Sequence, residues 1–129
     1  MYLFVCTGNT CRSPMAQALW RARGHEAMSA GLYAMDGSCA SSGARNAMKL
    51  MGLDLSHHRA QRVTEALMRS ADKVVGISQR HALALMQQFP QYADKISAMP
   101  RDIADPFGGD DDDYLRCAED IRHALDQLK

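Results

Sequence analysis

The sequence contains no hydrophobic run long enough to cross a membrane and no excess of charge of either sign. A membrane-spanning helix needs about 20 consecutive apolar residues. The apolar stretch at the N-terminus is only as long as a strand, so we expect a cytoplasmic protein with no membrane partner. The 15 basic and 15 acidic residues give a formal net charge of zero. This balance argues against nucleic acid as the main partner, because the phosphate backbone attracts basic surfaces.

Cysteine is also scarce. A small scaffold held together by disulfides would carry more than the four cysteines present here, so we expect reduced thiols. His25, His81 and His123 do not stand at metal-ligand spacing from any cysteine, and we expect neither a metal site nor a cofactor. The 47% hydrophobic and 23% charged residues are typical of one compact domain, which we place over residues 1–129.

The apolar patterning predicts strands that alternate with helices. Short apolar runs predict strands at 3–5, 27–32, 72–78 and 95–99. Apolar residues at helical spacing predict helices at 15–23, 45–51, 64–71, 79–89 and 113–128. This order favours an α/β fold with a parallel sheet flanked by helices on both faces. Ligands of such sheets bind beyond the carboxyl ends of the strands, where the loop after the first strand would lie.

That loop, residues 6–13, has the composition of an anion-binding site. We expect Ser13 to cap the next helix and Pro14 to be its first residue, so that backbone N–H groups and the helix dipole converge on one concavity. These groups and Arg12 would favour the thiolate of Cys6 and make it a nucleophile. The planar guanidinium of Arg12 matches two oxygens of a phosphate. The alternative is a loop with a structural cysteine and a surface arginine.

The sequence CTGNTCRSP, directly after a first strand, resembles the phosphate-binding loop of the low-molecular-weight protein tyrosine phosphatases. The resemblance implies a protein phosphatase in which Cys6 forms a phosphocysteine intermediate, without a metal. It implies a phosphorylated protein or peptide as partner. The residues expected to bind the substrate's phosphate are Thr7, Gly8, Asn9, Thr10, Cys11, Arg12 and Ser13. The Ser13 hydroxyl can also donate to the thiolate, and we expect Asn9 to hold the loop by side-chain bonds to its own backbone.

A second chemical signal is the sequence Asp105-Pro106-Phe107-Gly108-Gly109. Transfer of a phosphoryl group to Cys6 leaves a group that needs a proton, which a carboxylic acid above the loop can supply. Pro106 restricts Asp105 to extended conformations. An Asp-Pro pair is by itself an ordinary turn signal. In the family, however, an Asp-Pro just before the last helix carries the general acid, and this implies that role for Asp105.

Two further side chains near the loop invite an interpretation. The resemblance implies that His58 belongs to a hydrogen-bond network behind the loop, and the alternative is a surface histidine. Cys11 stands five residues after Cys6, and the curvature of the loop could bring the two sulfurs together. Peroxide would then convert Cys6 into a reversible disulfide with Cys11, a redox-sensitive protection. The alternative for Cys11 is a small buried residue at the base of the loop, and we expect no role for Cys39 or Cys117.

The residues at the mouth of the site bear on the substrate. We expect Thr10, Phe107 and the loop 32–35 to shape it. Many relatives carry a bulky aliphatic residue where this chain has Thr10, whereas CTGNTCRSP together with DPFGG resembles the bacterial branch that acts on phosphoarginine. The Thr10 hydroxyl is a better neighbour for a polar guanidinium leaving group than for the phenyl ring of tyrosine. The family as a whole nevertheless implies phosphotyrosine as the substrate. The acidic residues 110–113 should interact with the helix dipole and favour basic substrates.

Two other classes of protein share parts of this pattern. An arsenate reductase of the same fold needs further cysteines to relay a disulfide, and residues 75–95 contain none. A non-catalytic phosphate-binding module would keep Arg12 but would have no use for both Cys6 and Asp105.

Overall fold

The computed structural model describes residues 1–128, which fold around a four-stranded sheet. Its strands are hydrogen-bonded in the order β2-β1-β3-β4, and every pair is parallel: β1 (Tyr2–Cys6), β2 (Ala27–Gly31), β3 (Lys73–Gly76) and β4 (Ile96–Ala98). Val5 pairs with Ala30 on one side and with Gly76 on the other. The strands that follow β1 in the sequence therefore lie on both sides of it, with β2 on one side and β3 and β4 on the other. In such a sheet the crevice at the carboxyl end of β1 is the expected ligand site.

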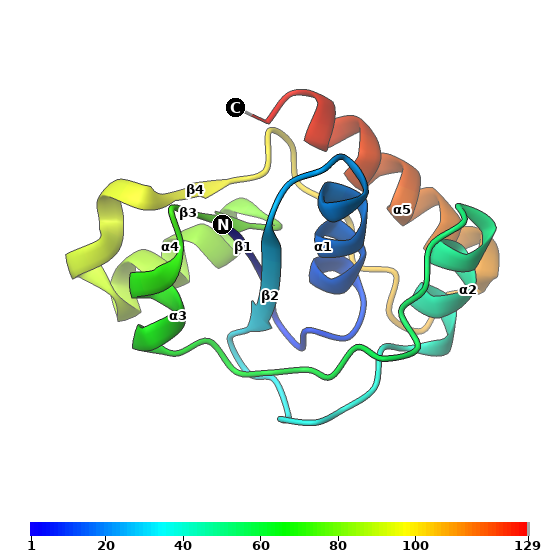
Figure 1. Ribbon diagram of the computed structural model, residues 1–129, viewed down its shortest axis with the longest axis horizontal. Helices are drawn as coiled ribbons and strands as arrows, with labels where there is room; N and C mark the ends of the chain where they lie inside the picture. The colour runs from blue at the N-terminus through cyan, green and yellow to red at the C-terminus, as the bar shows by residue number, and fades with distance from the viewer. Residues whose placement is uncertain (129) are drawn as a thin grey trace.

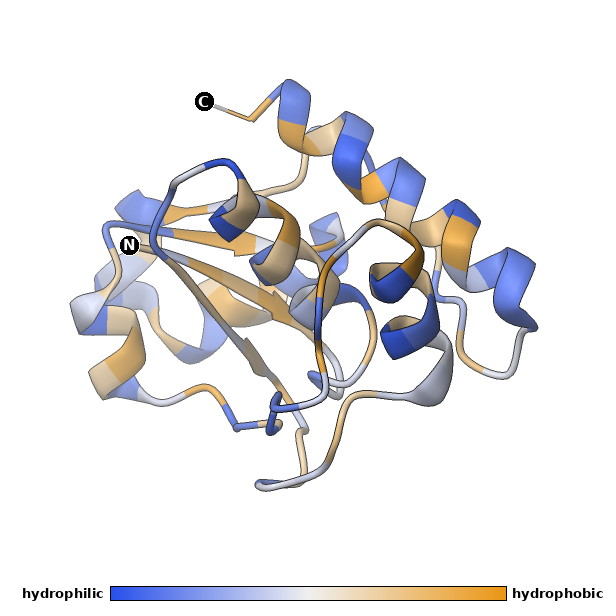
Figure 2. Ribbon diagram, turned by 45° about the vertical axis from the view of Figure 1, so that its right-hand side comes forward, coloured by the Kyte–Doolittle hydropathy of each residue, from blue (hydrophilic) through white to orange (hydrophobic). Residues whose placement is uncertain are grey.

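Helices cover both faces of this sheet, as the sequence predicts. The helical segments are α1 (Arg12–Ala22), α2 (Ser42–Leu50), α3 (Glu65–Ser70), α4 (Gln79–Gln88), the 3₁₀-helix η1 (Pro90–Lys95) and α5 (Asp111–Asp126). Figure 1 shows α1, α2 and α5 together on one face, and α3 and α4 on the other. In Figure 2 the strands and the inward sides of the helices are hydrophobic, while the outward sides of the helices are hydrophilic.

Each face of the sheet has its own core because side chains alternate along a strand. Phe4 packs with Met15 and Ile121 in the core under α1, α2 and α5. Its neighbours Leu3 and Val5 belong to the core under α3 and α4. The backbone of β1 is thus held from both sides.

The main correction to the sequence prediction concerns Ser13. Helix α1 begins at Arg12, Cys11 occupies the N-cap position without a side-chain cap, and Ser13 is already helical. Pro14 is still tolerated, because the N–H groups of a first helical turn have no partner within the helix. The hydroxyl of Ser13 is engaged elsewhere, which leaves the N–H groups of this turn uncapped by any side chain and available for an anion.

The first residues of other helical segments also differ from the sequence prediction, for local reasons. Helix α2 begins earlier than predicted because the Ser41 hydroxyl accepts from the backbone N–H of Ala44. Gly43 lies in that helix where a Cβ would stand 2.3 Å from the ring of Tyr114, so glycine allows α2 to pack closely on α5. Pro90 follows the predicted helix 79–89 and starts η1. Within residues 1–128, no helix is both long and apolar enough to cross a bilayer.

Candidate active site

The loop between β1 and α1 and the segment before α5 meet at one cavity of about 240 Å³. Its lining contains the predicted nucleophile, arginine and acid, with the loop residues between them: Cys6, Thr7, Gly8, Thr10, Cys11, Arg12, Asp105 and Phe107. Cys6 and Arg12 are 3% and 4% exposed. The fold therefore brings together groups that the sequence keeps far apart.

Two consecutive hydrogen bonds connect Asn9 through Ser13 to the sulfur of Cys6. The Ser13 hydroxyl oxygen lies 2.8 Å from Cys6 Sγ, and the same oxygen accepts from Asn9 Nδ2 at 2.8 Å. Because the amide supplies its own hydrogen, the hydroxyl hydrogen is left to donate to the sulfur or to the carbonyl oxygen of Ala30, and the sulfur at 2.8 Å is much nearer than that oxygen at 3.5 Å. This arrangement suits a negatively charged thiolate and gives Ser13 the donor role that the sequence predicts.

The guanidinium of Arg12 holds the segment that carries Asp105. Nη1 donates to the carbonyl oxygen of Ile103 at 3.0 Å, and Nη2 lies 3.6 Å from Asp105 Oδ2. The other carboxylate oxygen, Oδ1, accepts from the backbone N–H of Phe107 at 3.0 Å. The half-exposed carboxylate is thus held by contacts on two sides, and Asp105 lines the cavity.

Asn9 is the most constrained residue of the loop. It is fully buried and has a φ of 57°, in the left-handed region. Nδ2 also donates to Ser29 Oγ at 2.9 Å, Oδ1 accepts from the backbone N–H of Gln61 at 2.9 Å, and its carbonyl oxygen accepts from His58 Nε2 at 2.8 Å. The expectation that Asn9 bonds to its own backbone is wrong, because its partners come from neighbouring elements. The prediction for His58 is confirmed.

Sequence reasoning missed His81, a buried residue in the first turn of α4. Its Nδ1 accepts from the backbone N–H of Ser78, so Nε2 carries the hydrogen and donates to the hydroxyl of Thr7 at 3.0 Å. Burial, followed by the charges of Arg12 and Arg80, lowers the pKa of His81 to about 4. The imidazole is therefore neutral at pH 7. The missed signal was the spacing from Ser78 to His81, which forms a capping box.

Cys11 lies at the buried base of the loop. Its Sγ donates to Ser41 Oγ at 3.3 Å and stands 3.7 Å from the hydroxyl of Tyr114. Burial, and then the contact with Cys11, raises the pKa of Tyr114. All four cysteines of the chain are free thiols. That of Cys117 is buried in α5, and burial raises its pKa to about 12, so it is unreactive at neutral pH.

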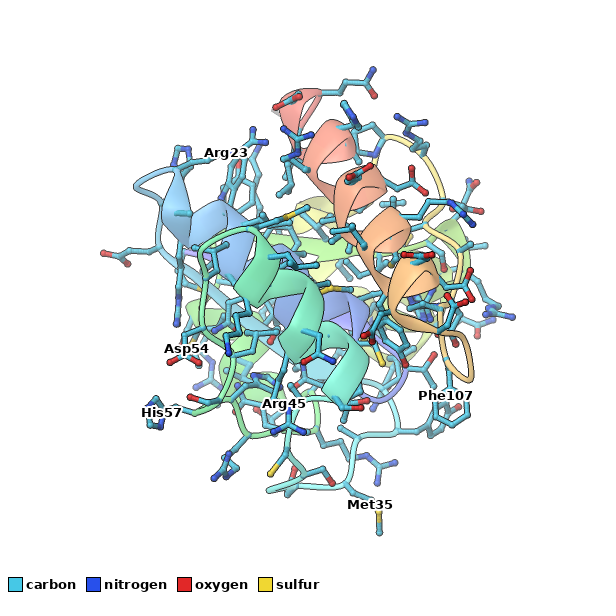
Figure 3. The ribbon with its side chains drawn as sticks, turned by 90° about the vertical axis from the view of Figure 1, so that its right-hand side faces the viewer. Arg23, Met35, Arg45, Asp54, His57 and Phe107 are labelled. Atoms are coloured by element: carbon cyan, nitrogen blue, oxygen red, sulfur yellow. The ribbon has the colours of Figure 1, made fainter. Side chains whose placement is uncertain are left out.

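The mouth of the cavity differs in part from the prediction. Thr10 and Phe107 line it, but no residue of the loop 32–35 does. Tyr33 and Met35 are instead 74% and 78% exposed, and the Tyr33 backbone N–H donates to the carbonyl oxygen of Thr7. Figure 3 shows Met35 and Phe107 projecting from the surface. In residues 1–128, no cluster of three histidine, cysteine or carboxylate side chains is arranged to hold a metal ion.

Comparison with known proteins identifies the same family that the loop resembles. Residues 2–129 match the family model described as low molecular weight phosphotyrosine protein phosphatase. The chain is 38% identical to a protein-arginine-phosphatase of Geobacillus stearothermophilus, over 98% of this chain and 91% of that protein. It is 34% identical to the low molecular weight protein-tyrosine-phosphatase Wzb of Salmonella typhi, over 81% and 75% respectively. The solved YwlE arginine phosphatase from Geobacillus stearothermophilus superposes with a TM-score of 0.94 at 35% identity, covering 98% of this chain and 88% of that structure.

Proposed function

Because the chain belongs to the low-molecular-weight phosphotyrosine protein phosphatase family, whose model spans residues 2–129, we propose that it removes phosphate from arginine side chains of proteins. The chain is a cysteine-dependent protein phosphatase, as its relatives are. The proposal concerns the substrate residue and the roles of the side chains in the cavity.

The observation that carries the choice of phosphoarginine is the position of Thr10. Its side chain lines the cavity together with Cys6 and Phe107. A hydroxyl there offers a hydrogen-bonding partner to a polar guanidinium, whereas it would leave a polar group unpaired against a phenyl ring. The relatives named protein-arginine-phosphatase match 98% of the chain, which supports the same choice.

In the first step the thiolate of Cys6 attacks the phosphorus in line with the leaving group. An S–P bond forms while the P–N bond to the arginine side chain breaks. Arg12 and the uncapped N–H groups of the loop stabilise the charge on the equatorial oxygens. Asp105 donates its proton to the departing guanidine nitrogen.

In the second step Asp105, now a carboxylate, accepts a proton from a water molecule. The water oxygen attacks the phosphocysteine, the S–P bond breaks, and inorganic phosphate leaves. Cys6 returns as a thiolate and Asp105 as an acid. Neither step requires a metal or a cofactor.

The substrate proposal is tested with Thr10→Ile, which removes the hydroxyl and adds aliphatic surface. The measurement is kcat/KM on phosphoarginine and phosphotyrosine peptides of the same sequence. We expect wild type to prefer phosphoarginine and Thr10→Ile to shift the ratio toward phosphotyrosine by about tenfold, the effect of one such contact. Thr10→Ser keeps the hydroxyl and should keep the preference. An unchanged ratio in Thr10→Ile would leave phosphotyrosine as the substrate.

We also propose that Cys11 protects Cys6 from irreversible oxidation. Peroxide oxidises the thiolate of Cys6 to a sulfenic acid and is reduced to water. The thiol of Cys11 then attacks this sulfur, an S–S bond forms, and a second water leaves. An added thiol reduces the disulfide again. Support comes from the presence of Cys6 and Cys11 in the lining of the same cavity.

A further inference from the structure

A second cavity, of about 510 Å³, lies behind the phosphate-binding loop, and we call it the rear cavity. It is lined by residues of α1, β2 and the segment 53–61, which follows α2. No residue lines both this cavity and the active-site cavity. Figure 3 shows Asp54 and His57, which line the rear cavity, on the opposite side of the view from Phe107 at the active-site mouth. The rear cavity is therefore a separate place on the molecule.

Its charge favours an anion. Arg21 from α1 and Arg59 from the segment 53–61 both line it. Among residues 1–128, neither guanidinium is paired with a carboxylate. The single carboxylate in the lining, that of Asp54, accepts from the backbone N–H of Ser56. Arg21 Nε donates to the carbonyl oxygen of Ala27 at 2.7 Å, and Arg59 Nη1 donates to that of His58 at 2.8 Å. These acceptors carry no net charge, so the lining holds two positive charges and one carboxylate.

The side chain of His58 reports the same positive field. Burial lowers the pKa of His58, and the charges of Arg59 and Arg21 lower it further, against the opposing effect of its bond to Asn9. The positive charges of both arginines therefore reach His58, which lines the cavity. Its volume lies within the roughly 300–1,000 Å³ of small-molecule sites, and Leu53 and Leu55 add apolar wall.

The floor of the rear cavity also supports the catalytic loop. His58, Gln61 and Ser29 line the cavity, and each bonds directly to Asn9 at 2.8–2.9 Å. Asn9 in turn donates to Ser13, which contacts the sulfur of Cys6. A ligand in the rear cavity that restrains His58, Gln61 or Ser29 would therefore also restrain the geometry of the phosphate-binding loop.

We propose that the rear cavity binds a small organic anion bearing carboxylate or phosphate groups, and that this binding raises turnover at Cys6. An anion held between Arg21 and Arg59 ties the segment 53–61 to α1. It thereby steadies the His58 and Gln61 bonds that hold Asn9 in its left-handed conformation. A better-ordered set of N–H donors stabilises the transition state more strongly. The effect on turnover rests on the proposed phosphatase function, whereas the binding does not.

Binding is tested by following backbone amide NMR signals during separate titrations with citrate and with methylenediphosphonate, which distinguish carboxylate from phosphorus-centred anions. We expect the signals of Arg59 and Gln61 to shift at lower concentration than those of Gly8 and Thr10. Arg59→Gln should weaken this binding about fivefold, the effect of one partly exposed charge. Arg45→Gln removes an equal charge from an exposed position of α2 outside the cavity and should leave binding unchanged.

Shifts confined to Gly8 and Thr10 with both probes, or equal weakening by both variants, would overturn the site. Turnover is then measured with and without a saturating concentration of the binding probe. We expect kcat to rise about twofold in wild type and in Arg45→Gln but not in Arg59→Gln. An unchanged kcat, or a rise in KM alone, would overturn the coupling. If no phosphopeptide is hydrolysed even without a probe, the proposed function fails while the NMR titration still decides on the site.

Discussion

The ring nitrogen Nε2 of His81 lies 3.0 Å from the hydroxyl oxygen of Thr7. This bond joins the first turn of α4 to the phosphate-binding loop and crosses from the segment after β3 to the segment after β1. Together with the bonds around Asn9 it holds the loop from two sides. His81 touches neither Cys6 nor Arg12 through a hydrogen bond, so we regard it as a positioning residue.

Replacing His81 should affect both stability and turnover. His81→Ala removes a buried donor and half of a capping box, and should lower the free energy of unfolding by about 2 kcal/mol. It should lower kcat more than it raises KM, because Thr7 loses its partner. Denaturant unfolding and steady-state kinetics measure these changes. His81→Asn places a hydrogen-bonding amide at this position and should recover part of the lost stability and turnover. Equal losses in the two variants would contradict a positioning role.

The lowered pKa of His81 predicts a dependence of stability on pH. Its pKa is about 4 in the folded chain, against an ordinary value of 6.5. As the pH falls below 6.5, the unfolded chain therefore takes up this proton before the folded chain does. Protonation of this histidine therefore leaves the free energy of unfolding unchanged above about pH 6.5 and lowers it progressively down to pH 4, by on the order of 2–3 kcal/mol.

The measurement compares the free energy of unfolding at pH 7 and pH 4 in wild type and His81→Asn. The variant should lose less stability over this interval. A pH dependence identical in both proteins would show that other groups, such as His58, account for the loss.

Replacing the nucleophile separates chemistry from binding. Cys6→Ser should reduce turnover below detection, because the serine hydroxyl is a far weaker nucleophile than a thiolate at neutral pH. Binding of inorganic phosphate should persist, because Arg12 and the N–H groups of the loop remain. A chromogenic phosphatase assay and a phosphate titration measure the two properties. Retained turnover would refute the assignment of Cys6.

Oxidation tests the proposed role of Cys11. Wild type inactivated by peroxide should regain most of its activity on addition of a thiol, because a disulfide is reducible. Cys11→Ala should not, because its Cys6 sulfur would proceed to irreversible acids. Cys39→Ala removes an exposed thiol and serves as the matched control, with recovery like that of wild type. Equal recovery in wild type and Cys11→Ala would contradict protection.

The sequence alone was informative wherever chemistry or structure depends on neighbours in the chain. Alternating apolar runs predicted the α/β fold, and the helix predicted over 64–71 is α3, which Thr64 caps. The spacing from Cys6 to Arg12 and the Asp105-Pro106 pair predicted that these groups act as one set, and all three residues line the same cavity.

Tertiary structure decided which partners those residues find. Ser13 has the composition of a helix cap, yet its hydroxyl is taken by Asn9 and Cys6 once the loop closes. The partners of Asn9 come from β2 and from the segment 53–61, and the partner of Thr7 comes from α4. A hydrogen bond between distant segments leaves no periodic trace in a single sequence, because only packing fixes which side chains become neighbours. For that reason the sequence by itself determined the family and suggested the proposed reaction chemistry, while only the folded chain revealed the support of the loop and the rear cavity behind it.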